Sequence, residues 1–166
     1  MPRRRFVPSL GLDRPVHLLG YCWSVEAPNW PTPQAFVDPD WDPAEREAVA
    51  RYLDAGRLDN QQAGFSWCRF RCGTPHLGSR EWTDGYYRWP EGLSHYVRVH
   101  QVRLPQPFVD HALHRPWFGY WIRRLLVALL EWWPGLGAHY SEAWWQSFPT
   151  ATQVGSGEIT AVTPPA

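Results

Sequence analysis

The sequence contains no lysine, so all sixteen of its basic residues are arginines. Sixteen acidic residues bring the formal net charge to zero. This usage, together with abundant proline, alanine, glycine and tryptophan, is typical of GC-rich coding and indicates a bacterial source. A neutral chain also lacks the concentrated basic surface of a dedicated nucleic-acid-binding domain.

Basic residues do exceed acidic ones locally, between residues 68 and 103. A nucleic-acid-binding role is therefore kept as a less favoured alternative, and a salt-dependent affinity would support it. The arginines that it would use are Arg69, Arg71, Arg88, Arg98 and Arg103.

Cysteine is scarce, and its count of three is odd, which makes a poor disulfide framework. Residues 1–11 carry a basic patch, but no apolar core of signal-peptide length follows it. Both observations lead us to expect a cytoplasmic protein.

Long apolar runs are missing as well. The most hydrophobic stretch, residues 116–137, is interrupted by Arg123, Arg124 and Glu131 and is too short of apolar residues to span a bilayer. We expect a buried helix over 117–133. Peripheral membrane contact through its tryptophans is the minority alternative.

The common catalytic motifs are absent. The sequence has no H-E-x-x-H, no His-x-Glu, no Gly-rich phosphate loop and no G-x-S-x-G. A role without catalysis is therefore favoured. The alternative is a zinc hydrolase in which three side chains bind the metal and Glu91 acts as general base.

The composition predicts one globular domain. The chain has 166 residues, of which 44% are hydrophobic and 16% aromatic, enough for a real core. We expect a flexible arm over 1–15, a domain over 16–148 and a disordered tail over 149–166. Within the domain, a zinc-binding unit would cover about 64–105 and a tryptophan-rich helical part 106–148.

Local signals predict several elements. Asp42 as N-cap and Pro43 at the first helical position begin a helix that Gly56 ends. A strand is expected within 16–26. A hairpin over 80–89 would turn at Asp84-Gly85, the favoured pair for a type I′ turn.

Three short helices are expected after the hairpin. One begins at Pro90 or Glu91 and carries "LSHYVRVH". The next would occupy "QPFVDHALHRPW", residues 106–117, with Phe108, Val109 and Leu113 facing inward. A last helical turn would lie in "YSEAWWQSF", residues 140–148.

Cysteine and histidine occur with metal-ligand spacing in the middle of the chain. Three residues separate Cys68 from Cys72, and four separate His95 from His100. Both gaps lie within the windows of structural zinc sites. A cysteine turn, then a hairpin, then a helix with the last two ligands is the layout of treble-clef zinc units. The sequence therefore predicts an α+β fold built on a treble-clef-like zinc unit and flanked by helices.

Two alternatives stay open for this pattern. His95 and His100 are about 140° apart around a regular helix, so the last turn would have to loosen, or His76 could replace one of them. In the second alternative no metal is bound. The cysteines are then small buried hydrophobic residues and the histidines are ordinary helix residues.

The segment "SWCRFRCG … SREWTDGYYRWPEGLSHYVRVHQVRLP" resembles an uncharacterised group of small bacterial proteins. That group has a C-x-x-C-G knuckle, a T-D-G turn, W-P-E-G-L-x-H-Y, a second histidine and R-L-P. The likeness covers about residues 40–112 and implies that Cys68, Cys72, His95 and His100 belong to one unit. It implies no activity, and this chain has an extra residue between the two cysteines.

The sequence thus predicts a structural zinc ion and a protein–protein interaction role. Tryptophan and arginine dominate interface hot spots, and the chain has twelve tryptophans. The expected partner is another protein, bound through Trp117, Trp121, Trp132, Trp133, Trp144 and Trp145.

Overall fold

The computed structural model describes residues 15–114 and 140–148. The expected arm up to residue 14, the helix over 117–133 and the tail from 149 lie outside these residues. The described elements are β1 (Val16–Leu18), the 3-10 helix η1 (Pro33–Phe36), α1 (Pro43–Asp54), β2 (Arg57–Gln61), β3 (Arg80–Thr83), β4 (Tyr87–Pro90), α2 (Leu93–His100), α3 (Gln106–His114), β5 (Tyr140–Ser141) and α5 (Ala143–Gln146).

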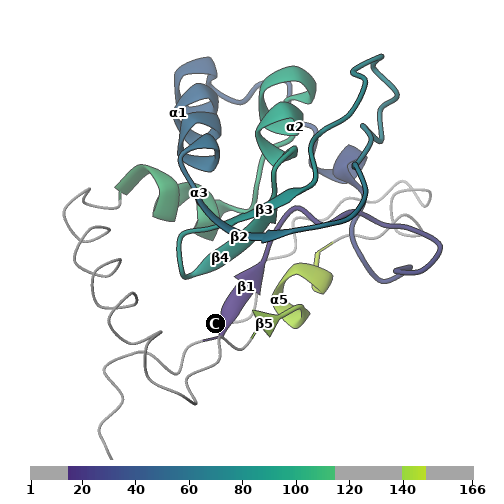
Figure 1. Cartoon of the computed structure of the whole chain (residues 1–166). Coiled ribbons are helices and arrows are strands. Elements are labelled where there is room, and N and C mark those ends of the chain that lie inside the picture. The colour runs from purple at the N-terminus through teal and green to yellow at the C-terminus, as the bar shows by residue number, and fades with distance from the viewer. Residues whose placement is uncertain (1–14, 115–139, 149–166) are drawn as a thin grey trace, which may run out of the picture.

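The fold is mixed α+β, with five strands in the order β2-β3-β4-β1-β5 (Figure 1). The pairs β2–β3 and β3–β4 are antiparallel, whereas β1 lies parallel to both β4 and β5. The strand expected within 16–26 is only three residues long. β2 was not foreseen, because its sequence "RLDNQ" is polar and almost entirely exposed.

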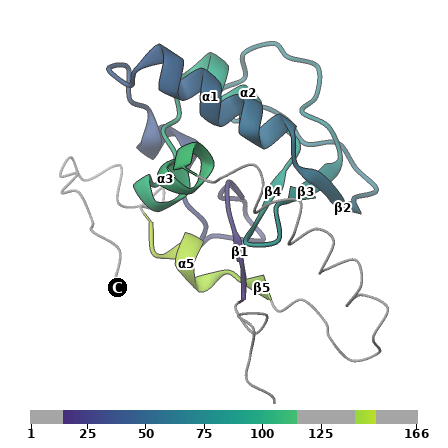
Figure 2. The same ribbon diagram turned by 90° about the vertical axis from the view of Figure 1, so that its left-hand side faces the viewer.

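Helix α1 begins as its sequence predicts. The Asp42 carboxylate accepts a hydrogen bond from the Glu45 backbone N–H at 2.7 Å, and Pro43 occupies the first helical position. α1 and α2 lie side by side on one side of the sheet (Figure 2). Val49 and Leu53 of α1 are fully buried in the core.

The hairpin β3–β4 forms where it was expected, but its connection differs. A type I′ turn needs positive φ at both central residues, and only Gly85 has it, with φ 84°. Residues 84–86 instead make a three-residue connection. The Asp84 carboxylate stabilises it by accepting hydrogen bonds from the backbone N–H groups of Tyr86 and Tyr87.

Helix α2 begins at Leu93, later than the expected start at Pro90 or Glu91, because Pro90 still belongs to β4. It ends at His100, since Gln101 adopts a left-handed conformation with φ 55°. Leu93 and Val97 are buried in the core.

The main core lies between the sheet and helices α1, α2 and α3. Phe108 of α3 is fully buried, with its ring centroid 5.0 Å from that of Tyr87 and 6.1 Å from that of Trp89. Leu113, expected to face inward with Phe108, is 38% exposed instead. Its position at the end of α3 carries it beyond the packed face.

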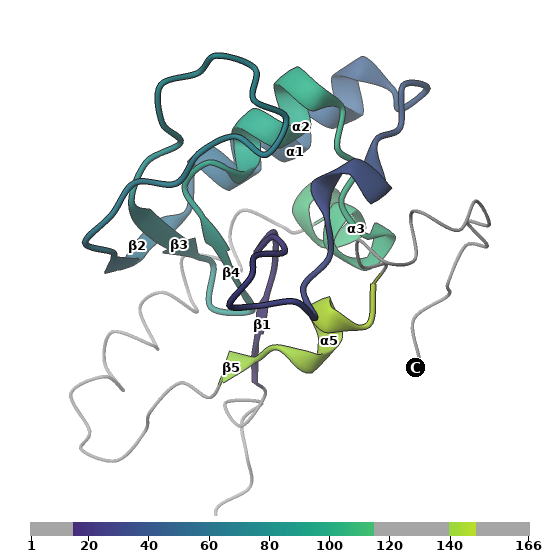
Figure 3. The same ribbon diagram turned by 90° about the vertical axis from the view of Figure 1, so that its right-hand side faces the viewer.

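A long connection, residues 62–79, links β2 to β3 and runs beside α2 (Figure 3). We call it the knuckle loop. It contains no helix or strand and packs on a small second cluster, the knuckle cluster, made of Cys68, Leu77, Tyr96 and Val102. Among the helices of residues 15–114 and 140–148, none is long and apolar enough to cross a bilayer.

Candidate metal centre

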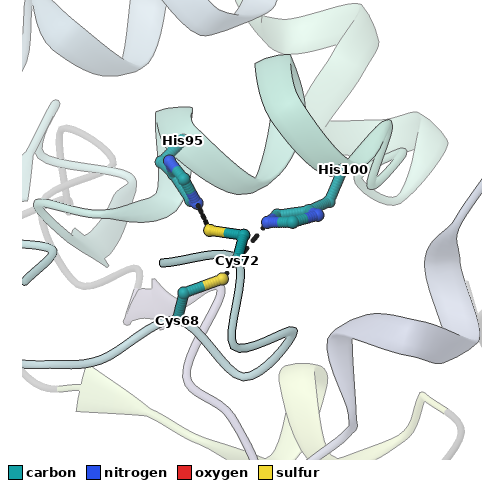
Figure 4. A group of neighbouring side chains, drawn as sticks. All are labelled: Cys68, Cys72, His95 and His100. Carbon is teal, nitrogen blue, oxygen red and sulfur yellow. Dashed lines mark hydrogen bonds between the residues drawn. The ribbon is translucent and has the colours of Figure 1, made fainter. Parts of the chain in front are cut away.

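Two thiols and two imidazoles converge between the knuckle loop and α2 (Figure 4). They belong to Cys68, Cys72, His95 and His100, and one donor atom from each lies within 4.8 Å of all the others. The structure therefore brings together the four side chains that the sequence spacing singled out, close enough to hold one metal ion.

Two sulfur–nitrogen distances are close to those of a tetrahedral site. The Cys68 sulfur lies 3.2 Å from Nε2 of His100, and the Cys72 sulfur 3.4 Å from Nε2 of His95. In a tetrahedron with Zn–S near 2.3 Å and Zn–N near 2.0–2.1 Å, a sulfur and a nitrogen are about 3.6 Å apart. Small movements of the loop would therefore suffice to coordinate an ion.

The three residues between the cysteines include one with an unusual backbone conformation. Arg71 has φ 52°, and its N–H donates to the Cys68 carbonyl at 3.0 Å. Gly73, with φ 84°, continues the turn after Cys72. The left-handed Arg71 lets the chain double back so that both sulfurs face α2, at the cost of about 1–2 kcal/mol of backbone strain.

Helix α2 presents the two histidines from its first and last turns. His95 lies in the first turn of the helix and His100 is its last residue. The Phe70 ring, between the two cysteines, stacks on His100 with centroids 4.1 Å apart and planes at 9°. This contact fixes the imidazole plane and brings the two pairs of donors together.

Tyr96 adds a link that sequence reasoning missed. Its hydroxyl accepts a hydrogen bond from the Arg69 backbone N–H at 2.9 Å and donates to the Trp67 carbonyl at 3.3 Å. The ring is 5% exposed. The sequence offered one signal for this link. Tyr96 directly follows the candidate ligand His95, so its ring could be expected to reach the same loop.

Cys72 is the exposed member of the group and Cys68 the buried one. The Thr74 hydroxyl lies 3.3 Å from the Cys72 sulfur. Hydrogen bonding with the Thr74 side chain and then its backbone lowers the pKa of the Cys72 thiol to about 5. A thiolate is the form that binds metals.

His76 is not part of the group. Its Nδ1 accepts from the Gly78 N–H at 3.4 Å, and its ring packs on Phe65 with centroids 4.5 Å apart. It therefore belongs to the far end of the knuckle loop.

Glu91, the candidate general base, is engaged in backbone hydrogen bonds. Its carboxylate accepts from the N–H groups of Ser79 and Arg80 at 3.1 and 3.2 Å. A side chain at Gly78, which has φ 84°, would overlap that carboxylate. Glu91 thus joins the end of the knuckle loop to the start of α2, which is a structural task.

Three of the five arginines proposed for nucleic-acid binding are paired with carboxylates. Arg88 pairs with Asp59 and Glu81, Arg98 with Glu47 and Asp54, and Arg103 with Asp38. Within residues 15–114 and 140–148, the other two, Arg69 and Arg71, make no ion pair.

The structure describes two of the six tryptophans expected at a partner surface. Trp145 is 4% exposed, and its indole N–H donates to the Tyr21 carbonyl at 2.6 Å. Trp144 is partly buried against the main core. Trp145 therefore contributes to packing and presents no exposed ring. Trp117, Trp121, Trp132 and Trp133 lie outside the described residues.

The third cysteine, Cys22, is not one of the four converging donors. Burial raises the pKa of the Cys22 thiol to about 12, so it stays protonated at neutral pH.

Comparisons with protein-family models, with curated proteins and with solved structures found no match to this chain. The resemblance described above therefore stays a prediction, and the site is inferred from its own geometry.

Proposed function

We propose that this protein binds one structural zinc ion through Cys68, Cys72, His95 and His100, in a treble-clef-like unit of knuckle, hairpin β3–β4 and helix α2. Zinc is the metal that a tetrahedral set of two thiolates and two imidazoles suits best. The observation that carries the proposal is the convergence of all four donor atoms within 4.8 Å.

A structural role follows from the number of protein ligands. A catalytic zinc keeps one coordination position for water or substrate, whereas four protein donors fill a tetrahedron. The hydrolase alternative also needs a base beside the metal, and the hydrogen bonds of Glu91 commit its carboxylate elsewhere. The ion would instead crosslink a loop without helix or strand to a packed helix.

The surface of the knuckle loop is proposed to bind another protein. Support comes from large side chains left exposed on the knuckle loop, Phe65 at 59% and Trp67 at 65%. Exposed aromatic rings next to unpaired arginines are typical of interaction sites.

The metal content of the purified protein tests the proposal, measured by inductively coupled plasma mass spectrometry. Wild type should carry about one zinc per chain, and Cys68→Ser and His95→Ala should each lose most of it, because each variant removes one of the four donors.

Matched controls are available for both ligand types. Cys22→Ser removes a thiol, and His76→Ala an imidazole, outside the group of four, so both should keep wild-type zinc. A wild-type protein without stoichiometric metal would contradict the proposal, and so would an ion lost equally in the two control variants.

A further inference from the structure

A groove of about 390 Å³ lies beside the metal centre. One wall comes from residues 20–22 at the end of β1, and the other from residues 65–67 and Arg69 of the knuckle loop. Pro90 and Tyr96 also line it. We call it the knuckle groove. Its volume suits one or two large side chains of a bound chain.

The candidate metal ligands lie next to one wall of this groove. Trp67 and Arg69 flank Cys68 directly in the sequence. The Tyr96 hydroxyl bonds to the backbone of both residues from α2. Since the knuckle loop has no helix or strand of its own, an ion that joins Cys68 to His100 would fix the wall at the distance from residues 20–22 that leaves the groove open.

The knuckle-loop side of the groove is positively charged. The knuckle loop, residues 62–79, contains Arg69 and Arg71 and no acidic residue. Neither arginine makes an ion pair within the described part of the chain. Glu26 feels the charge of Arg69, but its lowered pKa comes first from hydrogen bonds with its own backbone and with Ser24. Zinc with two thiolates and two neutral imidazoles carries no net charge, so the loaded site would not neutralise Arg69 and Arg71.

Apolar surface accompanies the charge. The Trp67 side chain is 65% exposed and that of Phe65 59% exposed, and both residues line the groove. Exposed rings of this size mark binding surfaces, and an unpaired guanidinium beside them selects a carboxylate through charge-assisted hydrogen bonds.

From this charge and shape complementarity, we propose that the knuckle groove binds an extended acidic segment of a partner protein, with an apolar side chain in the groove and a carboxylate on Arg69. The inference rests on the proposed structural metal, because that ion would order the wall that carries Trp67 and Arg69.

The test is fluorescence anisotropy with the full-length, zinc-loaded protein and the fluorescein-labelled peptide GDELFEDG. Saturable binding is expected, with the uncharged peptide GNQLFQNG at least about tenfold weaker, since loss of one charged hydrogen bond corresponds to that factor. Arg69→Gln should weaken binding of the acidic peptide by about tenfold as well. Trp67→Ala should weaken both peptides.

Two matched variants control for charge and for exposed apolar surface. Arg51 on α1 and Leu58 on β2 are both exposed and do not line the groove, so Arg51→Gln and Leu58→Ala should bind as wild type does. Equal affinity of wild type and Arg69→Gln for the acidic peptide would overturn the proposal. Binding of oligothymidylate in place of the peptide would overturn it in favour of nucleic acid.

The metal measurement separates this failure from that of the proposed function. Stoichiometric zinc without peptide binding contradicts the groove alone. Peptide binding by a protein that carries no zinc contradicts the structural metal, and with it the stated reason for the order of the wall.

Discussion

The main core and the knuckle cluster both include residues of α2 but are stabilised in different ways. Fourteen buried residues from the sheet, three packed helices, α5 and the connecting loops make up the main core. The knuckle cluster has only four, and one of them is Cys68 of the candidate metal centre. The knuckle loop around it has no helix or strand, so its order needs another source of free energy.

The difference shows that apolar burial can order the main core but is much smaller in the knuckle loop. Ordering each backbone residue costs conformational entropy, which burial must offset. Phe108 and Trp89 contribute large buried rings to the main core, whereas the knuckle loop leaves Phe65 and Trp67 mostly in solvent. A metal crosslink between loop and helix would supply the missing stabilisation.

Metal removal should separate the two regions most strongly. After chelation, we expect the free energy of opening in the knuckle loop to fall by more than about 5 kcal/mol, since structural zinc contributes about 10–16 kcal/mol in small zinc-binding peptides. Hydrogen exchange read by mass spectrometry checks this, with peptides from 62–79 losing protection and those from α1 keeping it. Equal losses in both peptides would show that the regions form one cooperative unit.

Truncation in the main core should have the next largest effect. Phe108→Ala removes a fully buried ring and should lower the free energy of unfolding by about 3–5 kcal/mol, measured by urea denaturation. Leu113→Ala, at a partly exposed position of the same helix, should cost less than about 1 kcal/mol. Bound zinc should stay stoichiometric in the folded Phe108→Ala protein, and its loss would break the distinction between the regions.

The smallest effect concerns a buried carboxylate at the hairpin. Burial raises the pKa of Asp84, but hydrogen bonds from His111 and Tyr52 outweigh it and leave the pKa below its usual value. Asp84 therefore stabilises the fold above the usual aspartate pKa, and this contribution is lost as the pH falls through the lowered value.

Asp84→Asn should accordingly cost about 1–3 kcal/mol at neutral pH, and the difference from wild type should shrink below about pH 4. Urea denaturation from pH 7 to pH 3 measures it. Acid displaces the metal in both proteins, so the difference isolates the carboxylate. If the difference in unfolding free energy between wild type and Asp84→Asn does not change with pH, the stabilisation comes from the packing of the side chain and not from its charge.

Much of the fold could be predicted because its signals are local. Asp42 with Pro43 set the start of α1, and Phe108 and Val109, expected to face inward, are buried in α3. The errors arose where contacts between distant segments decide which secondary structure forms. β2 is polar and forms only because β3 pairs with it, and Pro90 continues β4 instead of beginning a helix.

The four metal-site side chains could be predicted because the spacings of Cys68 from Cys72 and of His95 from His100 are local as well. The geometry that lets them meet could not. The left-handed φ of Arg71 and the stacking of Phe70 on His100 depend on the folded position of α2. The groove was also missed, since its walls lie more than forty residues apart in the sequence.

Helix α2 has a consequence for the order of events in folding. Its Leu93 and Val97 pack in the main core while His95 and His100 face the knuckle loop. The cysteine pair lies on the knuckle loop, and the histidine pair lies on α2, which also packs beside α1. Metal capture should therefore be a late step, and zinc uptake during refolding should proceed no faster than the burial of Trp89.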